Sequence, residues 1–357
     1  MKEKHVFAGN NTSVGFYSYF NYTFNPEEAN HIYILKGGPG VGKSSFMKKF
    51  GARMIKKGYE VEYVHCSSDN DSLDGILIPK LKIALVDGTA PHTIDPKIPG
   101  AVDEIINLGN YLDSKKLEEN KQEIMLVNKK KSNIYKSAYR YLECAGLISE
   151  EIQSIYDEVT NYNKFWYLSK EVSSKFFTSS LQENENQSPG KIKKLFSEAY
   201  TANGYIQYTE SLCKGKKVWA INGKNKNASS KLLQYIANEA MERGYDVEGY
   251  YDPLTPEKLQ HVFIPQLNAM IITSEDSSRK RYNAVINLNH IINYKKIKNQ
   301  EELENNIQLY ELLINLAIIK LSETKKEHEN LEAYYAKSMD FKGVDKCFEE
   351  LYKKYEK

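Results

Sequence analysis

Cysteine is scarce in this sequence, and the few cysteines are widely spaced. Among 357 residues only Cys66, Cys144, Cys213 and Cys347 occur, and no two of them stand in a C-x-x-C arrangement. This spacing argues against a disulfide framework and against a zinc site built on cysteine pairs. It favours a reducing compartment.

The chain also lacks a long apolar run and an excess of charge of either sign. Its richest apolar segment, 312–319, is far shorter than a membrane span, and residues 1–11 contain no stretch of the signal-peptide type. The formal net charge of +2 does not indicate a nucleic-acid or membrane partner. With 41% apolar and 27% charged residues, we expect a cytoplasmic globular protein.

Proline is absent between Pro99 and Pro189 and again after Pro265. Within both proline-free stretches, apolar residues recur at alternating three- and four-residue steps, which predicts amphipathic helices of coiled-coil type. We expect one helical hairpin at about 114–180 and another at about 296–357, each packing on its own domain rather than driving dimerisation. The expected seam positions are Ile134, Ala138, Tyr141 and Ala145 in the first stretch and Leu303, Ile314, Ala317, Leu321, Thr324, His328, Leu331 and Tyr335 in the second.

The chain contains an internal repeat that runs through most of its length. Four segments recur in the same order with small spacing changes: 4–20 with 193–208, 56–65 with 242–251, 73–89 with 259–275, and 105–113 with 285–293. Such ordered self-similarity indicates a tandem duplication. The polar segment 181–191 is the best linker, so we expect a first repeat at 1–185 and a second repeat at 186–357.

Each repeat shows apolar runs that alternate with a helical pattern. This alternation predicts an α/β fold with a parallel sheet and helices on its faces. The expected strands are 31–36, 60–65, 81–86 and 102–109 in the first repeat and 217–221, 246–251, 267–272 and 283–289 in the second. The expected helices after the first strand of each set are 43–57 and 229–243.

A complete phosphate-binding pattern lies in the first repeat. Residues 37–44, GGPGVGKS, fit G-x-x-x-x-G-K-[ST] between a predicted strand and a predicted helix. Glycines let successive backbone N–H groups point at phosphate oxygens, Lys43 is expected to reach the β- and γ-phosphates, and the Ser44 hydroxyl to bind Mg²⁺. The expected nucleotide-binding residues are Gly37, Gly38, Pro39, Gly40, Val41, Gly42, Lys43, Ser44 and Ser45.

An acidic residue ends the apolar run that follows. In KIALVDGTAPH (82–92), Asp87 stands where a Walker B acid would hold Mg²⁺, directly or through water. The alternative is a capping Asp at the end of a buried strand. We expect Ser44 and Asp87 to form the metal site.

The residue that activates the attacking water is not evident. Gly88 follows Asp87, where many P-loop ATPases have glutamate. Asp69, Asp71 and Asp74 are substitute candidates for base, metal ligand or substrate contact, with turn or helix capping as an equal alternative. His92 is a further candidate, for which a structural role is the commoner case.

These residues resemble the P-loop NTPase superfamily, through GGPGVGKSS and KIALVDGTAPH. The whole chain is similar to an uncharacterised bacterial family of tandem P-loop ATPases, through its paired F…T-x-x-G-aromatic openings, YEVEYVHCSSDNDSLD and the segment D-G-T-A-P-H. The resemblance implies two tandem P-loop NTPase-like domains with ATP and Mg²⁺ as ligands. It implies phosphate-binding or magnesium-binding roles, as in the superfamily, only for Gly37, Gly42, Lys43, Ser44 and Asp87.

The second repeat carries a degenerate copy of the loop. Gly42, Lys43 and Asp87 correspond to Asn227, Ala228 and Thr273, so we expect this half not to bind Mg·ATP productively. Lys224 and Lys226 offer partial charge at most. The second repeat is then either a scaffold or the donor of a cation to the first site in trans, for which Arg279, Lys280 and Arg281 are candidates.

Three functions fit these patterns. The first is an Mg²⁺-dependent ATPase that acts at Gly37–Ser44, with Lys43, Asp87, Asp69 and Asp71 as catalytic candidates. The second is a nucleotide kinase or other phosphotransferase with its acceptor among 69–74, Thr89 and His92. The third is a non-catalytic module in which ATP occupancy sets the angle between the halves and the helices bind a partner. No guanine-reading segment is evident, so ATP is preferred over GTP.

Overall fold

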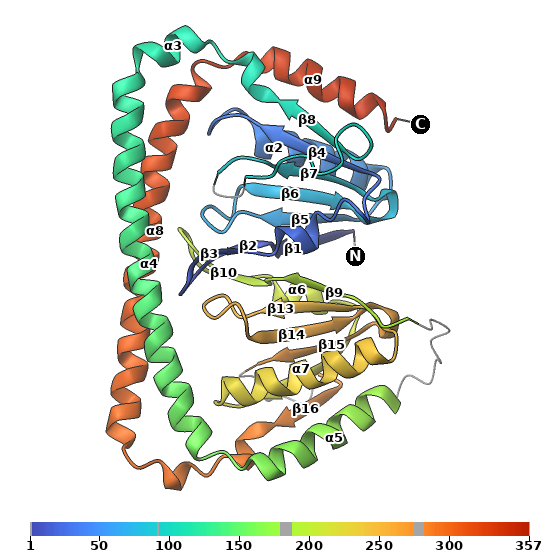
Figure 1. Ribbon diagram of the computed structural model, residues 1–357, viewed down its shortest axis with the longest axis vertical. Helices are drawn as coiled ribbons and strands as arrows, with labels where there is room; N and C mark the ends of the chain where they lie inside the picture. The colour runs from blue at the N-terminus through green and yellow to red at the C-terminus, as the bar shows by residue number, and fades with distance from the viewer. Residues whose placement is uncertain (1, 91–92, 179–187, 275–281, 357) are drawn as a thin grey trace.

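The computed structural model describes residues 2–90, 93–178, 188–274 and 282–356. It is an α/β structure with two six-stranded sheets that lie one above the other beside a pair of long helices (Figure 1). In the first sheet the strand order is β1-β5-β6-β7-β4-β8. These strands span Glu3–Phe7, Val61–His65, Leu73–Ile78, Ile83–Asp87, His31–Lys36 and Asp103–Asn107, respectively.

The second sheet repeats this topology strand for strand. Its order, read from the corresponding edge, is β9-β13-β14-β15-β12-β16. The strands span Ile192–Leu195, Val247–Tyr251, Leu259–Ile264, Ala269–Thr273, Lys217–Asn222 and Ala284–Asn287. The repeat seen in the sequence is therefore a structural repeat.

Both sheets are mixed, which corrects the expectation of purely parallel sheets. β6 pairs antiparallel with β5 and with β7, and β14 does the same with β13 and β15. The sequence interpretation missed β6 and β14, and with them the edge strands β1 and β9. The return from β6 to β7 is only a 3-10 turn, Pro79–Leu81, followed by Lys82 at φ 54°. A link this short can join only antiparallel neighbours.

One helix packs on each sheet directly after the loop. α2 (Lys43–Lys56) follows β4, and α7 (Lys226–Glu242) follows β12. Each repeat also has a β-hairpin followed by a short helix. In the first repeat these are β2 (Gly9–Thr12), β3 (Gly15–Ser18) and α1 (Phe20–Thr23); in the second they are β10 (Glu198–Thr201), β11 (Gly204–Gln207) and α6 (Thr209–Cys213).

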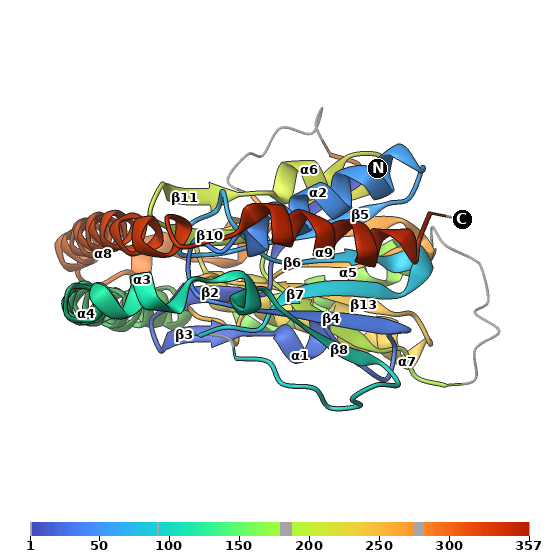
Figure 2. The same ribbon diagram turned by 90° about the horizontal axis from the view of Figure 1, so that it is seen from above.

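The two longest helices, one from each repeat, pack side by side. α4 (Lys121–Glu158) follows the short α3 (Ser114–Glu119), and it runs antiparallel to α8 (Gln300–Ala336) along one side of both sheets (Figures 1 and 2). Ala138, Leu142 and Ala145 of α4 are buried against Ala317 and Leu321 of α8. The predicted apolar seams therefore face each other within one chain.

The helices that follow this pair are exchanged between the repeats. α5 (Tyr162–Thr178) belongs to the first repeat in sequence, but its Phe165, Val172 and Phe176 are buried in the core under α7 of the second. α9 (Phe341–Lys353) ends the second repeat, but its Phe348 packs on α2 of the first. Two hairpins that each pack on their own α/β part, as expected from the sequence, are not what the structure contains. The expected boundary at 185/186 lies outside the described residues.

The two sheets meet along β1 and β9. Phe7 and Phe196 each donate a backbone hydrogen bond of 2.9 Å to the other's carbonyl oxygen. Among the helices of the described ranges, none is long and apolar enough to cross a bilayer.

Candidate functional site

The loop between β4 and α2 turns through glycines with positive φ. Gly37, Gly40 and Gly42 have φ values of 146°, 72° and 93°, a region in which residues with a β-carbon are strained. Gly42 is the N-cap of α2, and within the described residues no side chain accepts a hydrogen bond from the start of this helix. Its first N–H groups are thus available to an anion, which the positive end of the helix favours.

Lys43 lies folded over this loop. Its Nζ donates hydrogen bonds to the carbonyl oxygens of Gly37 and Gly38, at 2.7 and 2.9 Å, and lies 3.6 Å from Oδ2 of Asp87. Burial lowers the pKa of Lys43, while Asp87 opposes that shift. The loop lysine and the predicted Walker B acid are thus brought together, as β4 and β7 are neighbours in register at Leu35 and Asp87.

The two predicted magnesium ligands, Ser44 and Asp87, offer side-chain oxygen atoms at the same end of the sheet. Ser44 Oγ accepts a hydrogen bond of 3.1 Å from the N–H of Leu73, and Asp87 Oδ1 accepts from the N–H and hydroxyl of Thr89 at 2.9 and 2.5 Å. A hydroxyl, a carboxylate and substrate phosphates form a donor set that Mg²⁺ prefers. The residues therefore fit this ion. The described residues contain no cluster of three or more His, Cys, Asp or Glu side chains that could hold a metal without such phosphates.

Helices of the second repeat lie directly on the loop. The ring of Tyr335 on α8 touches Gly38, and a β-carbon at Gly40 would lie 2.7 Å from the backbone oxygen of Glu332. Phe341, at the start of α9, lies 3.7 Å from the same position on Gly42. Gly38 and Gly40 are therefore needed for the approach of α8, and Gly40 for its positive φ as well.

Charged groups of α8 and α4 face the loop as well. Burial raises the pKa of Glu332, although the Gly40 N–H and Lys43 oppose the shift. Burial, together with the positive charges of Lys131 and Lys43, lowers the pKa of His328 to about 4, so this ring is neutral at pH 7. Lys131 on α4 lies 3.3 Å from His328 Nδ1.

The acidic candidates for the base are held by α8. Lys325 Nζ lies 2.8 Å from Asp69 Oδ1 and 3.8 Å from Asp71 Oδ2. Burial would raise the pKa of Asp69, but hydrogen bonds from Lys325 and Ser72 keep it below its usual value, which makes this carboxylate a weaker base. Asp71 is largely exposed. Asp74, on β6, is buried at 2% exposure. His92 and the candidates for a cation in trans, Arg279, Lys280 and Arg281, lie outside the described residues.

The degenerate loop of the second repeat is occupied by the protein itself. Asn225 caps α7 through a 2.8 Å hydrogen bond from the Ala228 N–H, and Gln153 of α4 accepts the Lys226 N–H at 2.7 Å. Asp157 of α4 accepts from the side chains of Asn225 and Asn227 at 2.8 and 2.7 Å. The start of α7 thus has a side-chain cap, whereas within the described residues the start of α2 has none.

The sequence analysis missed the side chains of α8 as parts of the site. Lys325 and Glu332 were not singled out, and His328 was assigned only to the helical seam. The available signal was the polar character of Thr324 and His328 at positions where the seam is otherwise mainly apolar.

Comparison with known proteins yields no match to a family model, a curated protein or a solved structure. The resemblance to P-loop NTPases thus rests on the residues of this chain alone.

Proposed function

We propose that the chain is an Mg²⁺-dependent ATPase that binds and hydrolyses ATP at the loop 37–45. The observation that carries this proposal is the contrast between the two loops. The first has glycines at positive φ, a helix start without a side-chain cap in the described residues and a lysine 3.6 Å from Asp87. In the second, the N–H groups of Ala228 and Lys226 at the start of α7 are already bonded to Asn225 and Gln153.

In this proposal the loop and α2 bind the phosphates through backbone N–H groups. Lys43 leaves the carbonyl oxygens of Gly37 and Gly38 and turns to the β- and γ-phosphates, because an anion is a better partner for an ammonium group than two carbonyl dipoles. Ser44 and Asp87 hold the magnesium ion, which supplies positive charge against the phosphate oxygens. Water attacks in line, and Asp69, Asp71 and His328 are the candidates to orient it.

The test is calorimetric titration with a non-hydrolysable ATP analogue and Mg²⁺, run on the native chain and on Lys43→Ala. We expect one site per chain that is lost in the variant, since the lysine is the main side-chain charge in the loop. Lys226→Ala is the matched control at the second loop and should leave the site intact. Two sites, one of them surviving Lys43→Ala, would mean that the second loop binds nucleotide.

One observation favours a non-catalytic, ATP-gated module as a second candidate. α8 of the second repeat lies against Gly38 and Gly40. Binding of phosphate in the loop would therefore change the preferred position of that helix. Release of inorganic phosphate from ATP separates the two candidates. Sustained release that Lys43→Ala abolishes supports the ATPase, whereas tight binding with negligible release supports the module.

A further inference from the structure

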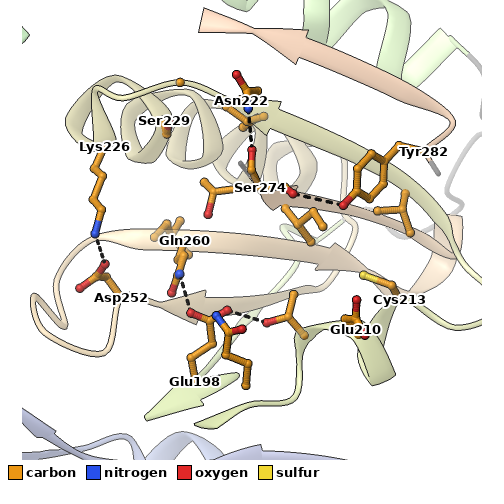
Figure 3. Close-up of a pocket in the computed structure, with 18 of the residues that line it drawn as sticks. Glu198, Glu210, Cys213, Asn222, Lys226, Ser229, Asp252, Gln260, Ser274 and Tyr282 are labelled. Atoms are coloured by element: carbon orange, nitrogen blue, oxygen red, sulfur yellow. Dashed lines mark hydrogen bonds and ion pairs between the residues drawn. The ribbon is translucent and has the colours of Figure 1, made fainter. Parts of the chain in front are cut away.

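The second repeat contains an open, polar cavity of about 1020 Å³ beside its degenerate loop (Figure 3). It extends from Lys226 and Ser229 at the start of α7, past Gln260 of β14, to Glu198 and Cys213. This volume lies at the upper end of the range typical of small-molecule sites.

The first repeat fills the corresponding place with aromatic rings. Gly9 and Gly75 leave room there: a β-carbon on Gly9 would lie 2.5 Å from Phe16 and 3.2 Å from Phe20, and one on Gly75 would collide with Phe24. Phe20 and Phe24 are buried in this core.

In the second repeat the same positions carry polar groups in place of this packing. The repeat register that aligns Phe7 with Phe196 aligns Gly9, Phe20 and Phe24 with Glu198, Thr209 and Cys213, and the register of β6 with β14 aligns Gly75 with His261. The rings of Phe20 and Phe24 are replaced by small side chains, that of Phe16 by Tyr205, and the glycines by a carboxylate and an imidazole. The second repeat thus lacks most of the apolar filling that the first contains.

These polar residues form a hydrogen-bonded wall. Glu198 is 4% exposed, and it accepts hydrogen bonds from Thr209 at 2.9 Å, from Gln260 at 2.8 Å and from the Tyr205 hydroxyl. His261 is 1% exposed; its Nδ1 accepts the Thr273 N–H at 3.1 Å, and its Nε2 lies 3.5 Å from Glu198. The wall is therefore ordered by its own contacts.

Glu198 carries a negative charge that lysine and arginine do not balance. Although burial opposes ionisation, a hydrogen bond and electrostatic attraction from His261, with hydrogen bonds from Tyr205 and Gln260, hold the pKa of Glu198 at about 2. Within the described ranges no lysine or arginine forms an ion pair with it. A buried carboxylate without a lysine or arginine partner favours a cationic group in the adjoining space.

The charge of the opposite sign lies at the mouth of the cavity. Lys214 and Lys224 of the lining are exposed, and Lys226 faces Asp252 at 3.8 Å. The inner wall is therefore negative, whereas the exposed charged residues of the lining are three lysines, Lys214, Lys224 and Lys226, and one glutamate, Glu210. A ligand with charge of both signs matches this arrangement better than one with charge of a single sign.

We propose that this cavity binds a small zwitterion of the amino-acid class. Its ammonium group, or a side-chain cation, lies against Glu198, and its carboxylate lies toward the exposed lysines of the lining. A nucleotide phosphate is disfavoured at the adjoining loop, because Asn225 and Gln153 already use donors at the start of α7. The proposal does not depend on ATP hydrolysis at the first loop.

The first test is a titration of the full native chain with each of the common amino acids at millimolar concentration, followed by thermal shift and calorimetry. We expect at least one to bind saturably. Its N-acetyl derivative and its decarboxylated amine, which each lack one of the two charges, should bind about tenfold more weakly. If no amino acid binds, or if the N-acetyl derivative binds as tightly as the parent, the proposal is wrong.

The second test changes Glu198, the acidic residue of the cavity wall. Glu198→Gln keeps the shape of the side chain and removes its charge, so we expect binding to weaken by about tenfold or more. Lys43→Ala is the matched control, and it should leave this binding unchanged, which separates the cavity from the ATP site. Equal affinity in Glu198→Gln and in the native chain would place the ligand elsewhere.

A third measurement needs no variant and therefore does not depend on the folding of Glu198→Gln. Cys213 lines the cavity, whereas Cys144 lies exposed on α4. We expect saturating ligand to slow alkylation of Cys213 by iodoacetamide and to leave the rate at Cys144 unchanged, as read by peptide mass spectrometry. Unchanged alkylation of Cys213 under ligand would overturn the proposal.

Discussion

At the scale of the residue, the loop that we propose to bind ATP faces a carboxylate that its own repeat does not supply. Glu332 belongs to α8 of the second repeat, and its charge acts on Lys43 across the loop. A carboxylate in this position attracts Lys43 and repels phosphate. The charge that an incoming nucleotide meets is therefore set by both repeats.

We predict that Glu332→Gln binds the ATP analogue more tightly. Removing one negative charge beside the phosphates is expected to strengthen binding by about fivefold, or about 1 kcal/mol. Calorimetry at pH 7 and low ionic strength measures the difference. Glu323→Gln, a change on the same helix at the ion pair of a half-buried glutamate with Lys320, is the control and should have little effect.

The pH dependence of the affinity difference between Glu332→Gln and the native chain tests whether the charge of Glu332 is its cause. Burial raises the pKa of Glu332, so the carboxylate gains a proton earlier on acidification than an exposed glutamate does. The advantage of Glu332→Gln over the native chain should therefore shrink as the pH falls. An advantage that stays constant down to pH 5 would mean that the charge of Glu332 is not its source.

At the scale of the element, the exchanged helices link the stability of each sheet to the other repeat. Phe348 of α9 packs edge-to-face on Phe46 with ring centroids 5.0 Å apart, and Arg53 of α2 donates to both carboxylate oxygens of Glu349 at 2.7 and 2.6 Å. Phe176 of α5 packs on Trp219 of the second sheet at 5.3 Å. Each sheet is thus covered on one side by a helix from the other repeat.

We predict that Phe348→Ala loosens the first repeat although the change lies in the second. Truncation of a buried phenylalanine costs about 3–5 kcal/mol. Hydrogen exchange should accelerate in α2 more than in α7. Phe176→Ala is the matched variant, and it should accelerate α7 more than α2. If each variant loosens only the α/β part of its own repeat, the exchange of helices is wrong.

At the scale of the whole molecule, a largely buried ionic cluster, whose side chains are 12–26% exposed, joins the two sheets along their shared edge. Lys4 lies 3.2 Å from Glu62 and 2.7 Å from Glu248, and Lys193 lies 2.7 Å from Glu62. Lys4 and Lys193 occupy corresponding positions of the repeat, so the cluster is close to twofold symmetric. The attraction of Lys193 and Lys4 outweighs burial and keeps the pKa of Glu62 below its usual value.

We predict that Glu62→Gln strongly lowers the free energy of unfolding. The change leaves Lys4 and Lys193 without a shared partner. Breaking a fully buried ion pair in this way costs about 3–5 kcal/mol, and partial exposure places this cluster at or below the lower end of that range. Chemical denaturation at pH 7 measures the loss. Glu3→Gln, at the exposed partner of His5, is the control and should change stability by less than about 0.5 kcal/mol.

The sign of the pH dependence follows from the lowered pKa of Glu62. Its contribution to stability is fully present above the unfolded value of about 4.3 and is lost as the pH falls through the lower folded value. The difference between Glu62→Gln and the native chain should therefore be large at pH 7 and close on acidification below about pH 4. A difference that grows as the pH falls would contradict this account.

The sequence by itself determined the features that depend on neighbours along the chain. The loop 37–44, the helix after it, Asp87 at the end of β7 and the internal repeat all follow from local pattern, because glycine spacing and apolar periodicity constrain the backbone within a few residues. The strands β4, β5, β7 and β8 were predicted within a few residues of their observed bounds. β6 was missed, because its short apolar run is interrupted by a glycine and an aspartate and so does not stand out as a strand. The sequence also does not reveal the direction of such a run in a sheet.

The tertiary structure alone decided which elements meet. Apolar periodicity shows that α4 and α8 have a face to bury but does not name the partner, and several pairings bury similar apolar area. Their pairing with each other brought Lys325 and Glu332 to a loop that lies almost three hundred residues away in the sequence. It also filled the second loop with Gln153 and Asp157. Long-range packing and ion pairing, which leave no local pattern, set the charge of both sites.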